Sequence, residues 1–461
     1  MPTPALPADF VWGTATASYQ IEGAVAEDGR GPSIWDTFTR LPGAISDGTN
    51  GDRADDHYHR YADDIALMAR LGFNAYRFSI AWPRIVPAGT GEVNQAGLDF
   101  YRRIAETCHE HGITPWATLY HWDLPQPLED AGGWLVPETA QAFADYAALT
   151  HEALGDVVEH WITLNEPWCS ALLGYGNGVH APGKQVGSDA LKAAHHLLLG
   201  HGLAVQKMRA SGHGSTIGIT LNLYSVRPAS DSAADAEAAR RSDGLGNRFF
   251  LDPVLLGSYP RDVLADAGVQ EWFGERTDDL PVIAAPLDFV GINYYSRHTV
   301  AAPEDGQFSD PSVPSASPGS ERVVNVDTGA PKTFMGWEVH PDGILDVVAM
   351  VAERTPGTPV YITENGAAYD DQVAPDGSVD DEDRCHYLEL HTQACADAVA
   401  AGLPLRGYFA WSFLDNFEWA FGESRRFGIV RVDYETQERT VKRSGWWFRD
   451  FLAGQQQGSQ A

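Results

Sequence analysis

The sequence has few basic residues for its length. Its 461 residues include 32 Lys and Arg against 63 Asp and Glu, which gives a formal net charge of −31. Such a surface repels the phosphates of nucleic acid and of anionic lipid, so we expect neither nucleic acid nor a membrane as a partner. The acidity indicates a well-solvated surface and gives no information about chemistry.

Cysteines and long apolar runs are also scarce. The four cysteines include no C-x-x-C pair, which argues against a disulfide framework and against a structural zinc site. The opening stretch, MPTPALPADF, has neither the basic nor the apolar region of a signal peptide. No apolar run is long enough to cross a membrane. We therefore expect a cytoplasmic protein.

What the sequence does contain is eight short runs of β-branched, aromatic and aliphatic residues. They occupy residues 10–20, 74–80, 114–120, 160–167, 216–224, 288–295, 359–366 and 405–413. Between them, apolar residues recur three and four apart, and several of these segments end in Gly, as amphipathic helices do. Eight alternating strands and helices predict an α/β fold, a single (β/α)8 TIM barrel with loop insertions at its C-terminal face.

The barrel is expected to fill residues 1–453 and to leave a disordered tail at 454–461. A doubly wound open sheet is the structural alternative, but GYGNG (174–178) lacks the glycine spacing of a phosphate-binding loop. We interpret GYGNG as a flexible loop. Residues 300–335, rich in Pro, Ser, Gly and Asp, form either a functional rim or a disordered insertion.

Polar and aromatic residues stand where the predicted strands end. One strand-end Asn or Glu commonly just caps the next helix. Six such ends together predict a site, because the active site of a barrel of this kind lies at the C-terminal ends of its strands. The residues are Gln20, His121, Trp122, Asn165, Glu166, Asn293, Tyr295, Glu364, Asn365 and Trp411.

Two of these ends place a Glu after an apolar run that contains Ile-Thr, in ITLNEP (162–167) and YITENG (361–366). Glycoside hydrolysis needs two carboxyl groups that face each other, one protonated and one ionised. A separation of about 5–5.5 Å gives retention of configuration and about 6.5–9.5 Å gives inversion. The sequence leaves the separation open.

The two carboxyl groups have different predicted surroundings. Glu166 stands among Trp161 and Trp168, and an apolar setting raises a carboxyl pKa, which suits an acid. Glu364 is expected to face Arg77 and Tyr295, a cation and a hydroxyl donor that would hold it ionised as a nucleophile.

Seven stretches, in order, resemble glycoside hydrolase family 1, the β-glucosidase family, over nearly the whole chain. They are FVWGTATASYQIEGA, RFSIAWPRI, YHWDLPQPL, TLNEP, GINYYS, YITENGAA and WSFLDNFEWAFGESRRFGIVRVDY. The resemblance implies a (β/α)8 fold and hydrolysis of β-linked glycosides with retention. It implies no metal and no organic cofactor.

The resemblance also implies roles for individual residues. Glu166 matches the acid/base and Glu364 the nucleophile. Asn165 matches the residue that binds the sugar 2-hydroxyl, and the indole of Trp411 matches the floor under the sugar. The matched sugar-binding positions are Gln20, His121, Trp122, Asn165, Asn293, Tyr295, Trp411, Glu418 and Trp419; Phe427 is expected in the pocket wall, and Trp168 and Trp337 on the leaving-group side.

The nearest alternative function is that of a 6-phospho-β-glucosidase. Glu418 disfavours it, because a carboxylate accepts hydrogen bonds from neutral hydroxyls and repels a phosphate. A sugar-binding pseudoenzyme is disfavoured because both Glu166 and Glu364 are present. Expected substrates are β-glucosides and cello-oligosaccharides, with galactosides and fucosides also accepted. The oligomeric state stays open.

Metal-dependent hydrolysis and thiol catalysis are weaker alternatives. The histidines at 57, 59, 195, 196 and 201 do not form a strand-end ligand set, so no metal is expected. Cys169 lies near the predicted site without a His-Asp partner pattern, and we interpret it as a buried neutral thiol.

Overall fold

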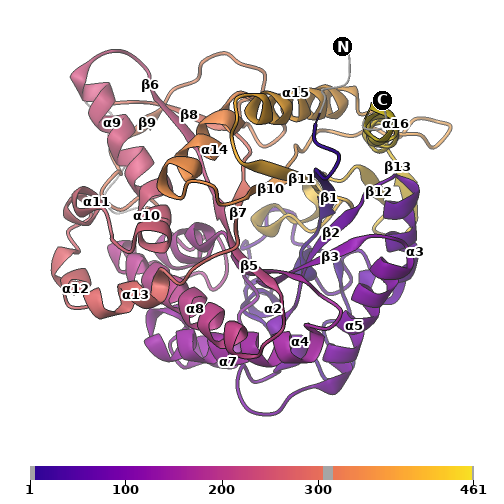
Figure 1. Ribbon diagram of the computed structural model, residues 1–461, viewed down its shortest axis with the longest axis horizontal. Coiled ribbons are helices and arrows are strands. Elements are labelled where there is room, and N and C mark those ends of the chain that lie inside the picture. The colour runs from indigo at the N-terminus through magenta and orange to yellow at the C-terminus, as the bar shows by residue number, and fades with distance from the viewer. Residues whose placement is uncertain (1–5, 305–314, 459–461) are drawn as a thin grey trace.

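The computed structural model describes residues 6–304 and 315–458. Eight parallel strands form a closed barrel in the order β1-β11-β10-β7-β5-β4-β3-β2 (Figure 1). The strands are β1 (Val11–Ala15), β2 (Ala75–Ser79), β3 (Thr114–Tyr120), β4 (His160–Asn165), β5 (Thr216–Asn222), β7 (Phe289–Asn293), β10 (Val360–Asn365) and β11 (Leu405–Trp411). Each lies inside one predicted run, so the predicted barrel is confirmed.

Helices surround the barrel and cover its outer face (Figure 1). The longer ones are α3 (His57–Arg70), α5 (Gln95–Glu110), α7 (Pro137–Leu154), α8 (Ala190–Ala210), α9 (Ala233–Asp243), α10 (Phe249–Leu256), α14 (Gly343–Arg354), α15 (Glu382–Ala400) and α16 (Arg443–Gly458). The shorter ones are α1 (Ser18–Ile21), α2 (Ile34–Phe38), α4 (Trp82–Ile85), α6 (Gln126–Asp130), α11 (Arg261–Asp266), α12 (Gln270–Gly274) and α13 (Leu280–Ile283).

Helix α5 shows why these segments are helical. Its buried residues include Leu98, Tyr101, Ile104, Ala105 and Cys108, spaced three and four apart. That spacing places one apolar stripe against the barrel, and each large apolar side chain buried there contributes about 1.5–3 kcal/mol. Among the described residues, no helix combines the length and the apolarity needed to span a bilayer.

Aromatic rings fill the barrel beneath its C-terminal end. The ring centroid of Trp116 lies 5.2 Å from those of both Phe289 and Phe409. A Cβ on Gly13 would lie 2.2 Å from the Phe409 ring, and one on Gly218 would lie 2.5 Å from the Phe289 ring. Glycine at these two strand positions therefore makes room for the rings. The barrel interior is a packed core that supports the loops at its C-terminal end.

Loop insertions gather at the C-terminal face, as predicted. The segments after β5 and β7 form a small sheet of β6 (Ser225–Pro228), β8 (Arg297–Ala301) and β9 (Val324–Asn325), which packs with α9 at one side of the barrel (Figure 1). After β11, β12 (Val430–Val432) and β13 (Arg439–Val441) pair as a hairpin. The predicted segment 300–335 includes β9, and its residues 305–314 lie outside the described part of the chain.

Two predictions about local order are wrong. Helix α16 continues to Gly458, so residues 454–458 are helical where a disordered tail was predicted; 459–461 lie outside the described residues. Helix formation continues because Phe448, Phe451 and Leu452 pack that helix into the core. Residues 174–176 belong to a buried π-helix, η2 (Cys169–Gly176), and not to a flexible loop.

Candidate active site

The C-terminal ends of the barrel strands surround a cavity of about 500 Å³. Four predicted site residues do not line it. Gln20, Arg77 and Asn165 lie directly behind lining residues, and the Asn365 side chain instead donates hydrogen bonds to the Tyr294 carbonyl and the Tyr387 hydroxyl. The predicted residues that line it are His121, Trp122, Glu166, Trp168, Asn293, Tyr295, Trp337, Glu364, Trp411, Glu418, Trp419 and Phe427. The convergence expected from the strand ends is therefore confirmed.

Glu166 follows the last residue of β4 and has a φ of 46°. This left-handed conformation is strained for a residue with a Cβ, and such strain is held in place at functional sites. Its Oε1 accepts a hydrogen bond from Asn293 Nδ2 at 2.7 Å, and its Oε2 accepts one from the Cys169 thiol at 3.2 Å. Burial, with the nearby charge of Glu364, raises the pKa of Glu166 to about 7. A large fraction of this carboxyl is protonated at neutral pH, as an acid requires.

Glu364 is the next-to-last residue of β10 and lies in a different setting. Its Oε1 accepts a hydrogen bond from Arg77 Nη1 at 2.6 Å, and its Oε2 accepts one from the Tyr295 hydroxyl at 2.7 Å. Both predicted contacts are therefore present. Burial nevertheless raises the pKa of Glu364, and Arg77 and Tyr295 only oppose that rise. Of the two carboxyl groups, Glu364 is the one that directly contacts a cation, so it ionises before Glu166.

A chain of hydrogen bonds joins the two carboxyl groups. Asn165 Oδ1 accepts hydrogen bonds from Arg77 Nη2 at 2.7 Å and from Asn293 Nδ2 at 3.0 Å. Arg77 contacts Glu364 and Asn293 contacts Glu166 on either side of this amide. Each partner is nearly fully buried. The two carboxyl groups are thus held in a fixed mutual arrangement, which catalysis by a carboxyl pair requires.

Several buried polar atoms at the site have no partner among the described residues, and two of them belong to predicted sugar-binding residues. These two are Gln20 Oε1 and His121 Nδ1. His121 Nε2 lies 3.0 Å from Asn165 Nδ2 and accepts its hydrogen bond, which leaves the proton on Nδ1. Burial and the charge of Arg77 hold the pKa of His121 well below its usual range, so its ring is neutral. Buried polar atoms are normally hydrogen-bonded, so these two indicate a place for a polar ligand.

Glu418 is the third carboxyl group of the cavity. Its Oε2 accepts a hydrogen bond of 3.4 Å from Gln20 Nε2. Burial raises the pKa of Glu418 to about 8, and the charges of Glu364 and Glu166 act in the same direction. No Lys or Arg is among the described residues that line the cavity. The cavity therefore suits neutral hydroxyl groups and disfavours a phosphate.

Aromatic rings form much of the wall. The ring centroids of Trp122 and Trp419 lie 4.4 Å apart, and those of Tyr295 and Trp337 lie 5.3 Å apart. Flat rings around a few fixed polar groups are what the C–H faces and the hydroxyls of a sugar need.

Part of the cavity lining was not predicted from the sequence. Asn222 ends β5, and Leu223 and Tyr224 close the predicted run 216–224, so their place at a strand end could have identified all three. The remaining residues lie on loops or away from strand ends and gave no such signal. The missed residues are Leu173, Val179, His180, Asn222, Leu223, Tyr224, Ser296, His298, Met335, Ala420 and Phe421.

The histidines that could suggest a metal have other partners. His57, which begins α3, lies 2.8 Å from Asp64, and His195 lies 3.0 Å from Asp279. Within residues 6–304 and 315–458, no group of three or more His, Cys, Asp or Glu could hold a metal ion. Cys169 is buried, and burial raises the pKa of its thiol far above the usual range. The interpretation as a neutral thiol is confirmed.

The chain is similar to known proteins over nearly its whole length. Residues 3–457 match the family described as Glycosyl hydrolase family 1. A bifunctional beta-D-glucosidase/beta-D-fucosidase of Bifidobacterium breve is 48% identical, with 97% of this chain and 98% of that protein covered.

Two solved structures are similar as well. The AHE enzyme from Alicyclobacillus herbarius has 51% identity, a TM-score of 0.92 and 99% of each chain covered. The family 1 β-glucosidase from Thermotoga maritima has 47% identity, a TM-score of 0.92, and 98% of this chain and 99% of that chain covered. The latter has also been solved in complex with deoxynojirimycin.

Proposed function

Because this chain belongs to glycosyl hydrolase family 1, we propose that it is a retaining β-glucosidase. Its substrates are terminal, non-reducing β-D-glucosyl residues of cello-oligosaccharides and of aryl and alkyl β-glucosides. The observation that carries this proposal is the pair of buried carboxyl groups, Glu166 and Glu364, joined through Arg77, Asn165 and Asn293.

In the first step, the Glu364 carboxylate attacks the anomeric carbon. The glycosidic bond breaks, and Glu166 transfers its proton to the departing oxygen. In the second step, Glu166, now ionised, takes a proton from water. The resulting hydroxide oxygen displaces Glu364 from the anomeric carbon and regenerates both groups. Two displacements at one carbon give net retention.

The surroundings of each group suit its role. Protonation of Glu166 near neutral pH supplies the acid, and ionisation of this residue after the first step supplies the base. Arg77 and Tyr295 orient the Glu364 carboxylate and favour its ionised form. The neutral ring of His121 and the amide of Gln20 offer one open donor and one open acceptor to sugar hydroxyls.

Several finer points belong to the same proposal. Galactosides and fucosides are also substrates, because Gln20 and Glu418 can hold a 4-hydroxyl in either orientation. The reaction needs no metal and no organic cofactor. The four cysteines are free and buried, which supports action in the reducing cytoplasm, at the end of cellulose breakdown. The strongly negative surface supports small glycosides as ligands, with no nucleic-acid or membrane partner.

The test is hydrolysis of 4-nitrophenyl β-glucoside by the wild type and by Glu364→Gln, at neutral pH and with a chelator present. We expect turnover by the wild type and a loss on the order of 10⁴-fold or more in the variant. Proton NMR of the wild-type reaction should show β-glucose as the first product. First appearance of α-glucose would exclude the double displacement.

A 6-phosphorylated glucoside serves as the comparison substrate. We expect it to be hydrolysed far more slowly than the neutral glucoside, because the cavity presents three carboxyl groups and no lining cation among its described residues. A wild type that is inert on the neutral glucoside and active on its phosphorylated form would replace this proposal.

A further inference from the structure

A group of buried charges lies behind the part of the cavity wall that runs from Trp411 to Phe427. We call it the charge cluster; its members are Asp371, Asp381, Arg384, Asp415, Arg426 and Lys442. Every side chain in it is at most 1% exposed except that of Arg426, at 22%. None of its members lines the cavity, so it is distinct from the site described above.

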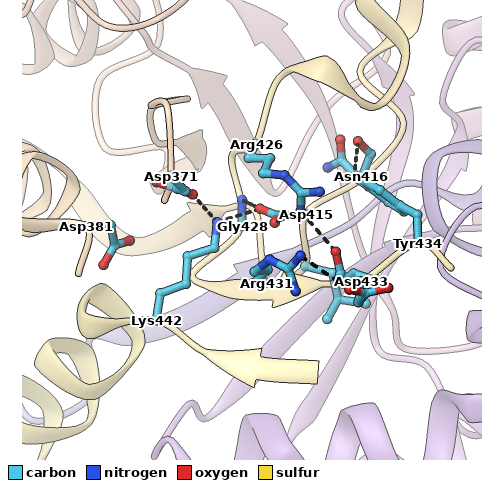
Figure 2. Close-up of polar contacts among 12 residues, drawn as sticks. Asp371, Asp381, Asp415, Asn416, Arg426, Gly428, Arg431, Asp433, Tyr434 and Lys442 are labelled. Carbon is cyan, nitrogen blue, oxygen red and sulfur yellow. Dashed lines mark hydrogen bonds and ion pairs between the residues drawn. The ribbon is translucent and has the colours of Figure 1, made fainter. Parts of the chain in front are cut away.

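Opposite charges alternate through the charge cluster. Figure 2 shows the ammonium group of Lys442 between Asp371 and Asp415, at 2.5 and 2.6 Å. Arg384 donates two hydrogen bonds to the Asp371 carboxylate, at 3.1 and 2.9 Å, and also pairs with Asp381. Arg426 pairs with Asp415 at 2.5 Å. Three cations and three carboxylates therefore balance one another, as buried charges must.

The same side chains hold the backbone of two active-site loops. Arg384 donates to the carbonyl of Ala367, three residues after Glu364, at 3.0 Å, and to the carbonyl of Arg426 at 2.7 Å. Asp415 accepts a hydrogen bond from the backbone N–H of Gly428 at 3.1 Å. The charge cluster thus joins the loop after β10 to the loop after β11.

The two ends of the loop after β11 are in close contact at this point. A Cβ on Gly428 would lie 2.1 Å from the backbone nitrogen of Asp415, so only glycine fits there. This contact closes residues 411–428 into one compact segment. Six of the cavity's lining residues belong to that segment, among them Trp411, Glu418 and Phe427.

A shift of Asp415 would be transmitted to the sugar-facing groups. Its neighbours Asn416 and Phe417 both accept hydrogen bonds from Gln20 Nε2, at 3.2 Å to Asn416 Oδ1 and 2.9 Å to the Phe417 carbonyl. Glu418 follows directly and contacts the same nitrogen. Replacing buried ion pairs by apolar groups is often neutral or stabilising, so stability alone is a weak reason for six buried charges. A better reason for these charges is that they fix the geometry of segment 411–428.

We propose that Asp415 and Lys442 are positioning residues, which hold segment 411–428 so that Glu418 and Gln20 meet the hydroxyl groups far from the scissile bond. They act through that segment and do not touch the substrate. This inference rests on the proposed function, because it assigns the reading of these hydroxyls to Glu418 and Gln20.

The test compares two substrates in Asp415→Asn and Lys442→Met. One substrate is 4-nitrophenyl β-glucoside, and the other is the β-xyloside, which lacks the carbon that bears the 6-hydroxyl. We expect kcat/KM on the glucoside to fall about 10- to 100-fold, since small displacements of binding groups have effects of this size. The ratio of glucoside to xyloside kcat/KM should fall at least about threefold, because the xyloside depends less on the displaced groups.

The matched control is Arg354→Met. Arg354, at the end of α14, pairs with Asp252 of α10 at 2.7 Å, and neither residue lines the cavity. This variant should lower the melting temperature and leave the substrate ratio at its wild-type value. Asp415→Asn keeps the volume of the side chain and an oxygen for the Gly428 N–H. If Lys442→Met fails to fold, the substrate ratio of Asp415→Asn alone tests the inference.

A wild-type substrate ratio in both cluster variants, with lowered melting temperatures, would overturn the inference and leave the charge cluster a purely stabilising element. That outcome is distinct from failure of the proposed function, which would appear as a wild type inactive on both substrates.

Discussion

The cavity has two parts that differ in composition and in origin. The inner part holds the polar groups, such as Glu166, Glu364 and Glu418, which are all at most 8% exposed. The outer part is apolar and more open, with Val179 46% exposed and Phe421 38% exposed. Hydrogen bonds to fixed groups discriminate between hydroxyl patterns, whereas an apolar wall discriminates weakly and by shape. The comparison therefore predicts strict selection of the sugar and loose selection of the leaving group.

Among the variants that compare the two parts, the largest effect is expected at their boundary, where Glu166 meets the leaving group. Glu166→Gln should reduce kcat/KM on cellobiose roughly 10³- to 10⁴-fold, because an alkoxide cannot leave without a proton. On 2,4-dinitrophenyl β-glucoside the loss should be much smaller, since dinitrophenolate leaves unprotonated. Steady-state kinetics on both substrates, with the melting temperature as a control for folding, provide the measurement. Equal losses would show that Glu166 is not the acid.

The next largest effect concerns the inner part alone. Glu418→Ala should reduce kcat/KM on 4-nitrophenyl β-glucoside about 100-fold, because it removes hydrogen bonds to sugar hydroxyls and leaves Gln20 without this partner. The loss on the β-xyloside should be smaller. An equal loss on both sugars would contradict the role of Glu418 in reading the far hydroxyls.

A smaller effect is expected in the outer part. Phe421→Ala should reduce kcat/KM on an aryl glucoside roughly 3- to 10-fold, the value of one aromatic contact. It should leave the ratio of glucoside to xyloside unchanged. Phe334→Ala is the matched control, because Phe334 is 43% exposed and contacts the same Arg425 as Phe421, yet does not line the cavity. A changed sugar ratio in Phe421→Ala would remove the distinction between the two parts.

The smallest effect concerns pH. With the pKa of Glu166 at about 7, kcat/KM should fall as the pH rises past that value, because the acid loses its proton. The thiol of Cys169 donates to the Glu166 carboxylate and so favours the ionised form. Cys169→Val should therefore move this descending limb to higher pH, by about a few tenths of a pH unit. Cys395→Val, at a buried position in α15, should leave the limb unmoved. A shift to lower pH in Cys169→Val would reject the role given to the thiol.

The comparison of the two parts also explains what could be predicted. Glu166 and Glu364 stand at the ends of β4 and β10, and each of these strands is a continuous apolar run that is recognisable alone. Outer residues such as Val179 and Met335 come from loops, whose paths depend on contacts with distant segments. Local composition failed in the same way at residues 454–458, where the polar character of the stretch and its two Gly suggested disorder, but tertiary packing of α16 maintains a helix.

The sequence by itself determined the eight strands, their parallel β-α connection and the residue types at their ends. It therefore determined that two Glu residues would meet at one face of a barrel. The tertiary structure alone decided which groups contact them. Arg77 and Glu364 are separated by 287 positions and Asn293 and Glu166 by 127, so no local pattern records either pair. Burial raises the pKa of both carboxyl groups, and their unequal partners let Glu364 ionise first. Both conditions exist only in the folded barrel.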